Sequence, residues 1–293
     1  MSALQQAIDA AISEAIGKTF VCKQSRSIGG GSISAASLIS SGTHSFFLKT
    51  NKSSQLEMFS AEADGLIELR KANVIRLPEP ICYGEVGATA FLVLENLSLG
   101  SGNKSSASAL GAKLAKLHQI KAKQFGWYRN NTIGATVQIN AQTDSWVDFY
   151  RQHRLRFQLS LAAEHGYGGE LQVLGDRLCE NLAVFFNTYQ PYPALLHGDL
   201  WSGNYAYANG EPVIFDPATY YGDREADIAM TELFGGFPAE FYASYNEALP
   251  LDDGYSVRKN LYNLYHILNH LNLFGSGYHG QAVGMMKGLL SKM

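Results

Sequence analysis

A linker-like segment at residues 98–108 divides the chain, and this division constrains the fold more than any other feature. The segment is rich in Gly, Ser, Asn and Lys, which favour loops over packed elements. Ahead of it, the pattern indicates a helix over 3–16, three short strands, a helix over 55–71 and two more strands. Behind it, helical spacing of apolar residues dominates. We therefore expect an α+β fold with two lobes, a small antiparallel β-sheet lobe at residues 1–95 and a larger, mainly helical lobe at residues 96–293.

Short apolar runs and their turn residues predict the individual elements. The glycines at 29–31 indicate a turn between two strands, because glycine is too flexible for a strand interior. After the first of these strands, further strands are expected at 35–40, 45–49, 81–83 and 90–94. In the second lobe, helices are expected at 107–120, 146–165, 169–189, 225–233, 238–247, 257–274 and 281–292.

Composition excludes several classes of protein. Of the 293 residues, 46% are hydrophobic and 17% charged, so the chain can bury a large core and is not a disordered polymer. The net charge of −3 gives no basic excess, so we expect neither nucleic acid nor a membrane surface as a partner. No signal-peptide pattern or membrane-spanning run is present, and the separated Cys22, Cys82 and Cys179 fit neither a metal motif nor a disulfide framework. These features predict a cytoplasmic protein.

The most specific motif places two carboxylates and an amide after apolar strands. Asp199 follows the run 195–196, Asn204 comes five residues later, and Asp216 follows the next apolar run. Phosphoryl transfer needs an oriented hydroxyl and a divalent cation over the phosphates, and these oxygen-bearing side chains could supply both. Asp199 would accept the proton of the attacking hydroxyl, while Asn204 and Asp216 would bind Mg²⁺. Taken singly, these residues could cap turns, but their conjunction favours a kinase.

Upstream residues could bind the nucleotide. Gly29, Gly30, Gly31 and Ser32 offer backbone N–H groups for phosphate oxygens, although a hairpin turn explains the same pattern. The spacing matches neither of the two glycine-rich nucleotide-binding fingerprints, so this loop alone is a weak signal.

A lysine and a hinge complete the expected nucleotide site. Lys49, in the third strand, could reach the α- and β-phosphates, with Glu62 on the next helix as its ion-pair partner. Glu57 lies on the same helix and could serve instead. The main chain at Glu95 and Leu97 could meet the adenine edge, because an apolar strand that leads into a hinge leaves backbone groups unpaired.

The chain resembles the fructosamine kinases, also called ketosamine kinases, which are relatives of the aminoglycoside and choline kinases. The resemblance rests on the segments 197–204, which includes a Trp, 222–230 and 268–275. It implies a two-lobed protein-kinase-like fold that uses ATP and Mg²⁺ to phosphorylate the 3-hydroxyl of a ketosamine, the rearranged adduct of a sugar with an amine. Such a reaction would remove the sugar from metabolites or proteins. The family's catalytic carboxylate corresponds to Asp199, and its metal ligands to Asn204 and Asp216.

Other residues near the motif have two possible roles. Trp201 could present its ring to sugar C–H groups as a substrate contact, or pack between the lobes. Asp223, Arg224 and Asp227 could position the loop at 197–204 or form a structural ion network. The histidines at 118 and 270 have no spaced partner that would suggest a metal site, so we expect both to be structural.

Two alternatives remain open. The acceptor could be an aminoglycoside, choline or a sugar, but a cationic acceptor calls for clustered carboxylates, whereas Arg151, Arg154 and Arg156 make their segment basic. A nucleotide-binding pseudokinase is less consistent with the sequence, since Lys49 and all three oxygen-bearing residues are present. Sugar length, the identity of the amine and the oligomeric state are not encoded in these motifs.

Overall fold

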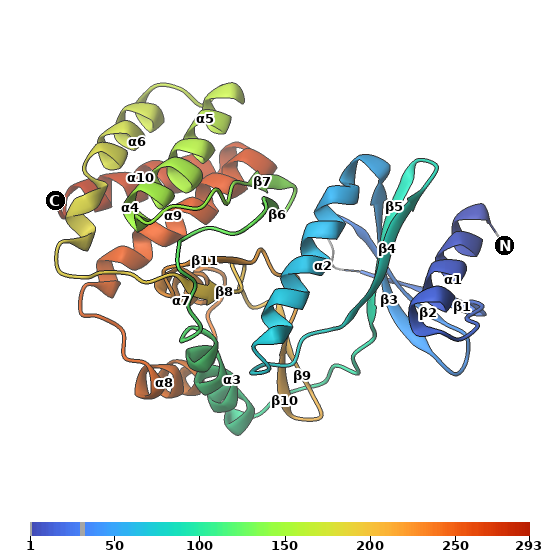
Figure 1. Ribbon diagram of the computed structural model, residues 1–293. Helices are drawn as coiled ribbons and strands as arrows, with labels where there is room; N and C mark the ends of the chain where they lie inside the picture. Colours follow the sequence, from blue (N-terminus) through green and yellow to red (C-terminus); the bar gives the residue numbers. More distant parts are fainter. Residues whose placement is uncertain (1, 30–32) are drawn as a thin grey trace.

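The computed structural model describes residues 2–29 and 33–293 and has the expected two lobes (Figure 1). The first lobe contains one antiparallel sheet with the strand order β1-β2-β3-β5-β4. Helix α1 (Ala3–Ile16) covers one face of the sheet and α2 (Leu56–Lys71) covers the other, between the sheet and the second lobe. The strands are β1 (Gln24–Ile28), β2 (Ala35–Ser40), β3 (Ser45–Lys52), β4 (Pro80–Val86) and β5 (Thr89–Glu95).

Strand β5 shows how the sequence builds these layers. Phe91 and Val93 belong to the core that contains α1, whereas Leu92 and Leu94 belong to the core that contains α2. Side chains alternate between the faces of a strand, so an unbroken apolar run fits a strand covered on both sides. The run at 90–94 therefore fixes β5 in the centre of a three-layer lobe.

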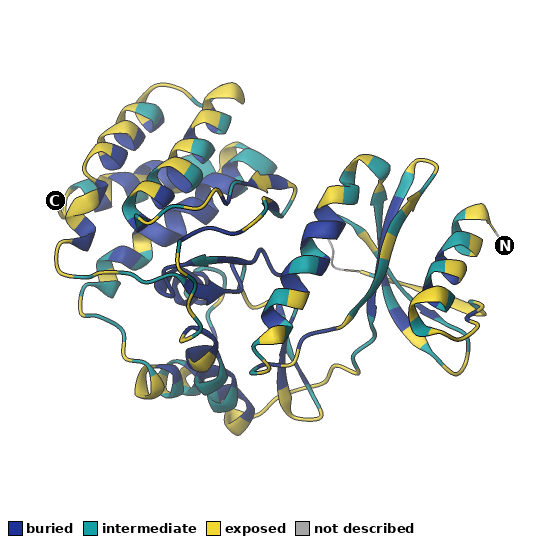
Figure 2. Ribbon diagram, in the orientation of Figure 1, coloured by how far each residue is buried: buried dark blue, intermediate teal, exposed yellow. Residues whose placement is uncertain are grey.

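The second lobe packs its helices around α9 (Tyr255–Phe274), which Figure 2 shows as largely buried. The other helices are α3 (Lys104–Leu117), α4 (Trp146–Tyr150), α5 (Phe157–Glu164), α6 (Glu170–Glu180), α7 (Glu225–Leu233), α8 (Ala239–Ala248) and α10 (His279–Leu290). Three short strand pairs join them: β6 (Asn131–Ile133) with β7 (Thr136–Gln138), β8 (Ala194–Leu196) with β11 (Tyr220–Gly222), and β9 (Tyr205–Ala208) with β10 (Glu211–Ile214).

The structure confirms the fold class and corrects one long helix. The helix expected at 169–189 ends at Glu180, and a separate 3₁₀ turn follows over Leu182–Phe186. At the break, the Asn181 side chain donates to the carbonyl of Arg177 at 2.8 Å. An Asn amide that bonds a nearby carbonyl competes with the continuing helix, which is why apolar spacing alone predicted too long an element. No helix within residues 2–29 or 33–293 combines the length and apolar character of a membrane span.

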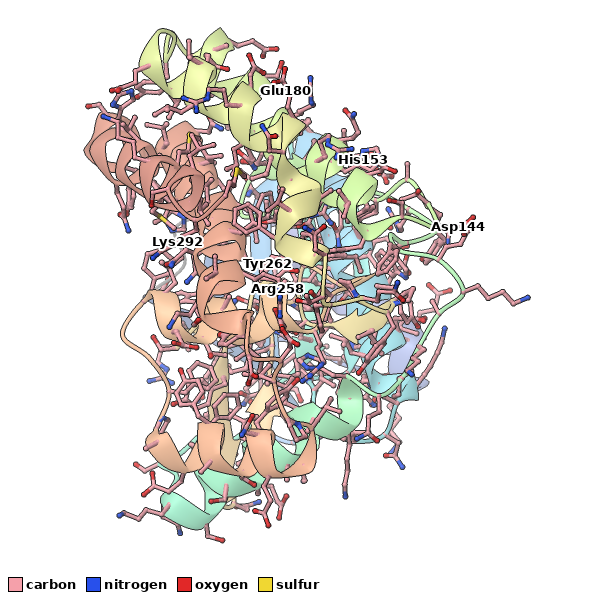
Figure 3. The ribbon with its side chains drawn as sticks, turned by 90° about the vertical axis from the view of Figure 1, so that its left-hand side faces the viewer. Asp144, His153, Glu180, Arg258, Tyr262 and Lys292 are labelled. Carbon is pink, nitrogen blue, oxygen red and sulfur yellow. The ribbon has the colours of Figure 1, made fainter. Side chains whose placement is uncertain are left out.

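A buried ion pair fixes α9 against α7 near the centre of the second lobe. Arg258 (labelled in Figure 3) donates through Nε and Nη2 to the two oxygens of Glu225, at 2.7 and 2.9 Å. Arg258 is 2% exposed and Glu225 is fully buried, so neither charge reaches water. Removing one partner of such a pair lowers protein stability strongly, because the other charge is then left buried without compensation.

We expect Arg258→Met to lower the free energy of unfolding by about 3 kcal/mol, since the substitution leaves the Glu225 carboxylate buried without its guanidinium partner and also removes the pair with Asp252. Urea unfolding measures this change. The control is Lys104→Met, which breaks the pair with Glu240 at a lysine side chain that is 87% exposed. The control variant should change stability by less than about 0.5 kcal/mol. Equal losses in the two variants would contradict the importance of the buried pair.

Candidate active site

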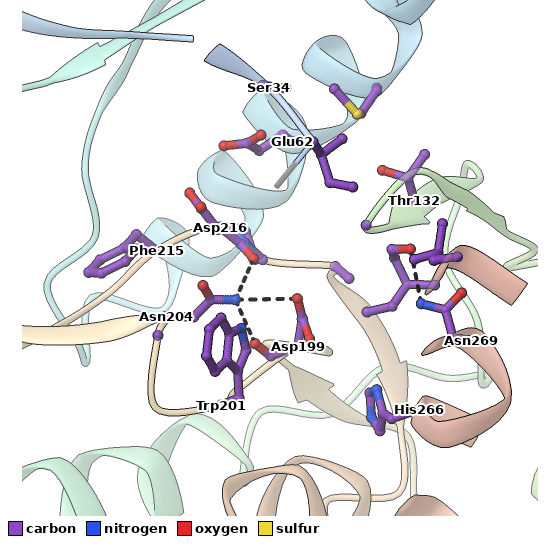
Figure 4. A pocket seen from close by; sticks show the side chains of 18 of the residues that line it. Ser34, Glu62, Thr132, Asp199, Trp201, Asn204, Phe215, Asp216, His266 and Asn269 are labelled. Carbon is purple, nitrogen blue, oxygen red and sulfur yellow. Dashed lines mark hydrogen bonds between the residues drawn. The ribbon is translucent and has the colours of Figure 1, made fainter. Parts of the chain in front are cut away.

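A cavity of about 840 Å³ lies in the cleft between the lobes. Strands β2 and β3 and helix α2 line it from the first lobe, and α9 lines it from the second. The loop at 197–204 and the segment after β10 complete the lining (Figure 4). The cleft therefore brings together most of the residues that the sequence singled out.

Asp199 lies in the loop at 197–204, which connects β8 to β9 and is here named the Asp199 loop. The loop passes very close to the next segment: a Cβ on Gly198 would lie 2.1 Å from the carbonyl oxygen of Ala218, and Gly198 has a φ of +84°. Only glycine fits both conditions. Burial and the nearby carboxylates of Asp216 and Asp227 raise the pKa of Asp199 to about 7. A carboxylate with a pKa near neutrality is suited to accept a proton at physiological pH.

His197 connects the Asp199 loop to the segment that carries Asp216. Its Nε2 donates to the carbonyl of Phe215 at 2.9 Å, which leaves Nδ1 to accept the N–H of Asp199 at 3.3 Å. Burial lowers the pKa of His197, so the ring is neutral and this tautomer is fixed. His197 is therefore a buried residue that ties the backbone at Asp199 to the backbone just before Asp216.

Asn204 and Asp216 face the same part of the cleft (Figure 4). The Nδ2 of Asn204 donates to the backbone oxygen of Asp199 at 2.9 Å and approaches its Oδ2 at 3.3 Å. Since the amide nitrogen is used inside the site, Oδ1 is the atom of Asn204 left to act as a ligand. Asp216 adopts a left-handed backbone conformation with a φ of +56°. Non-glycine residues in this region are strained, and such strain is concentrated at functional sites.

Lys49 is held by two carboxylates from opposite sides. Its Nζ lies 2.7 Å from Oε1 of Glu62 and 2.7 Å from Oδ1 of Asp216. Burial disfavours the ammonium ion, but the charges of Asp216 and Glu62 outweigh it, so the pKa of Lys49 lies above its ordinary value. Glu62, and not the alternative Glu57, is the partner of this lysine. The three residues join β3, α2 and the segment after β10 in one charged cluster.

The glycine-rich loop predicted to bind the phosphates is only partly described by the structure. Gly29 lines the cavity, while Gly30, Gly31 and Ser32 lie outside the described residues.

At the hinge, the N–H of Glu95 already donates to the carbonyl of Glu79 at 2.8 Å, and the Glu95 side chain pairs with Arg76. The N–H of Glu95 is therefore not free for an adenine, because β5 keeps its pairing to the end, and the contact predicted for the Glu95 main chain stays a prediction for its carbonyl. Within the described chain, the N–H of Leu97 makes no backbone hydrogen bond.

The charged residues at and just before the start of α7 have distinct structural roles. Asp227 accepts the N–H groups of His197 and Gly198, both at 2.8 Å, and contacts Nε2 of His118 at 3.2 Å. These bonds hold the Asp199 loop against α7 and give the buried His118 a structural role, as expected. By contrast, Asp223 and Arg224 bond to tyrosines and carbonyls away from the cleft.

The far end of the cleft is aromatic. Trp201 is 38% exposed and lines the cavity, so it does not pack in a core between the lobes. From the second lobe, α9 and the following turn contribute residues to which sequence reasoning gave no role in the cleft: His266, Asn269, His270, Phe274 and Tyr278. Burial lowers the pKa values of both histidines, that of His266 to about 3, so the rings are neutral hydrogen-bonding groups. His270 packs against Phe234, Phe274 and Tyr278, as expected of a structural residue, and it also lines the cleft.

The raised pKa of Asp199 predicts that this residue destabilises the free protein. When the pKa of an acid is higher in the folded than in the unfolded protein, the charged form of that acid disfavours folding. The Asp199 carboxylate therefore destabilises the fold above its ordinary pKa, and this effect grows with pH up to about pH 7. We expect Asp199→Asn to raise stability near pH 8 by about 2 kcal/mol, allowing for solvent in the cleft.

Thermal unfolding without divalent cations measures this gain, which should shrink near pH 5 and vanish near pH 4. A variant that is no more stable near pH 8 would show that the Asp199 carboxylate is well solvated.

The two-lobed fold and its charged cleft define a kinase-like phosphotransferase. The chain belongs to the fructosamine kinase family, whose sequence model matches residues 4–292. A probable ketoamine kinase of Synechocystis is 49% identical over 96% of this chain and 95% of its own length. The chloroplastic protein-ribulosamine 3-kinase of Oryza sativa is 44% identical over 89% of this chain and 77% of its own.

Solved structures agree with the fold. A crystal structure from Haemophilus somnus, provisionally assigned as a fructosamine-3-kinase, has a TM-score of 0.90 at 32% identity, covering 97% of this chain and 96% of that one. An aminoglycoside phosphotransferase solved with ADP and hygromycin B has a TM-score of 0.62 at 16% identity, covering 97% and 98%. At that identity, the second likeness shows the kinase-like fold alone.

Proposed function

We propose that this protein is an ATP-dependent kinase that phosphorylates the 3-hydroxyl of ketosamines, and so promotes removal of the sugar from amines. The observation that carries the proposal is the arrangement along one cleft. Lys49 and its partner Glu62 line the cleft from the sheet lobe, and Asp199, Trp201 and Asn204 line it from the Asp199 loop. The ribulosamine and ketoamine activities named for the relatives support this choice of acceptor.

In this mechanism, the residues bind, orient and move a proton. Residues 1–95 provide the nucleotide lobe, in which Gly29 and the ammonium of Lys49 contact the ATP phosphates. Leu97 meets the adenine edge through its N–H. Asp199 accepts the proton of the ketosamine hydroxyl while that oxygen bonds to the terminal phosphorus of ATP, and ADP leaves with the bond between the phosphates broken. The ring of Trp201 orients the sugar.

The residues of the cleft fit Mg²⁺. Asp216 uses Oδ1 for Lys49, so Oδ2 remains available, and its side chain is 45% exposed toward the cleft. Together with Oδ1 of Asn204 this gives two hard oxygen ligands. The described residues contain no group of three or more His, Cys, Asp or Glu side chains that could hold a metal without other ligands. This matches Mg²⁺, which binds one or two protein oxygens and completes its shell with phosphates and water. When bound, the ion neutralises charge on the transferring phosphate.

The lining of the cleft argues against a polycationic acceptor such as an aminoglycoside. Among the described lining residues, the carboxylates are Glu62, Asp199 and Asp216, and all three belong to the reaction centre. No other Asp or Glu among the described lining residues lies at the aromatic end of the cleft, where we place the acceptor.

The argument from the basic segment fails, however. Arg154 is fully buried and bonds the carbonyl of Ile139, and neither Arg151 nor Arg156 lines the cleft. The preference for a ketosamine over a polycation therefore depends on the missing carboxylates, not on those arginines.

The test is phosphate transfer from ATP to fructosyl-, ribulosyl- and erythrulosyl-amines, free and attached to a peptide lysine, with Mg²⁺ present. We expect turnover on at least one ketosamine and none on kanamycin or choline. Transfer to the aminoglycoside or to choline alone would support that alternative. Failure to bind Mg-ATP in a thermal-shift assay would instead support the pseudokinase.

The free thiols Cys22, Cys82 and Cys179 favour a reducing compartment such as the cytosol, and fractionation of cells tests this.

A further inference from the structure

An ion cluster outside the reaction centre fastens α2 to the second lobe. Arg129 lies in the segment before β6, and its Nη1 donates to the hydroxyl of Ser60 at 3.0 Å. The same guanidinium pairs with Asp64 and, through Nη2, with Glu57 at 2.9 Å. Ser60, Asp64 and Glu57 are spaced three, four and seven residues apart, so they form one face of α2.

Further contacts continue along the same helix. Tyr128, adjacent to Arg129, donates its hydroxyl to Oδ2 of Asp64 at 2.6 Å. About one turn of helix further on, Tyr221 of β11 donates to Oε1 of Glu68 at 2.8 Å. Between these contacts, a Cβ on Gly65 would come within 3.1 Å of the hydroxyl of Thr219. The helix therefore rests closely on the second lobe along much of its length, and Figure 1 shows it between the sheet and that lobe.

The same helix carries Glu62, which holds Lys49 at 2.7 Å. Glu62 lies two residues from both Ser60 and Asp64, so a shift of α2 at the Arg129 contact also moves the Glu62 carboxylate. We propose that Arg129 is a positioning residue. By joining α2 to the second lobe, it keeps the Glu62–Lys49 pair assembled in the free protein, with no modification or partner needed to bring the helix in.

The ion pairs of Arg129 differ in how much they contribute to holding α2. Glu57 is 86% exposed, and exposed pairs contribute little, so it is the weaker partner. The Arg129 and Asp64 side chains are 21% and 27% exposed, and Asp64 is bonded by both Arg129 and Tyr128. The pair Arg129–Asp64 is therefore the contact to break. This inference rests on the proposed kinase function for its activity readout, so a second readout, the affinity for Mg-ADP, is measured independently of any acceptor.

The experiment combines Arg129→Gln with Glu62→Gln. We expect Arg129→Gln to raise the KM for ATP and the Kd for Mg-ADP and to lower kcat/KM for ATP by about tenfold. Arg129→Lys keeps the charge but not the bidentate geometry of the guanidinium, so it should cause a smaller loss of kcat/KM and of Mg-ADP affinity. The control is Lys287→Gln, which breaks an exposed pair with Glu170 on the second lobe, away from α2, and should leave all constants unchanged.

A positioning role has a specific signature. In the Glu62→Gln background, adding Arg129→Gln should cause no further loss, because the arginine acts through that glutamate. The swapped pair Arg129→Asp with Asp64→Arg should recover much of the affinity lost by either change alone. If the losses of Arg129→Gln and Glu62→Gln multiply, or if Mg-ADP affinity is unchanged in a folded Arg129→Gln protein, the proposal is wrong.

Two further results would still allow the role of Arg129 to be decided. Should Arg129→Gln fail to fold, Asp64→Asn breaks the same contact from the other side and decides the question. Wild-type protein that binds Mg-ADP but phosphorylates no ketosamine would overturn the proposed substrate, while the Mg-ADP data would still decide the role of Arg129.

Discussion

Replacing Asp199 by asparagine is expected to lower kcat on a ketosamine by about 10²- to 10⁴-fold while leaving the affinity for ATP largely unchanged. Asparagine has nearly the same shape and can still accept the contact from Asn204, so the loop keeps its geometry. It cannot accept a proton from the acceptor hydroxyl. The loss therefore falls on the chemical step and not on nucleotide binding.

Steady-state kinetics with varied ATP, together with Mg-ADP titration of the same protein, separates these two effects. The stability measurement described above is an internal control: a variant that gains stability near pH 8 yet loses kcat is folded and chemically disabled. A decrease in kcat of less than about fivefold would refute the role of Asp199 as general base. An equal decrease in ATP affinity would point to disruption of the nucleotide site instead.

The central part of this site was accessible from sequence because its residues lie within a short stretch of chain. Asp199, Asn204 and Asp216 are spaced by a loop and one strand pair, so their convergence follows from local chain geometry. Lys49 and Glu62 could be paired because a helix directly follows the strand of the lysine. In each case, the contact needs few residues of chain between its members.

The acceptor end could not be predicted in this way. His270 lies 71 residues beyond Asp199, on a helix whose apolar spacing gave no sign of which face meets the cleft. Likewise, no sequence pattern singled out Arg129, since its partners on α2 precede it by 65 or more residues. Contacts between distant elements depend on how the lobes pack, and periodicity within one element carries no information on that packing.

The second large effect is expected for Asp216→Asn, which should lower kcat by about 10³-fold and increase the Mg²⁺ concentration needed for half-maximal rate. Asp216 has a left-handed backbone, a conformation that asparagine tolerates, so the substitution changes charge without changing the fold. It removes the anionic ligand proposed for the ion, and it leaves Lys49 with Glu62 as its one remaining carboxylate partner.

Asp216→Asn should also change the neighbouring base. The Asp216 charge is, after burial, the largest contribution that raises the pKa of Asp199, so removing it should lower that pKa. The residual activity of the variant should then persist to lower pH than the wild-type activity, because Asp199 stays deprotonated over a wider range. Rate profiles against Mg²⁺ and against pH measure both effects, with the exposed Asp253→Asn as the charge-matched control. An unchanged Mg²⁺ requirement would exclude Asp216 as a metal ligand, whereas an acid limb that does not move would show that the two carboxylates titrate independently.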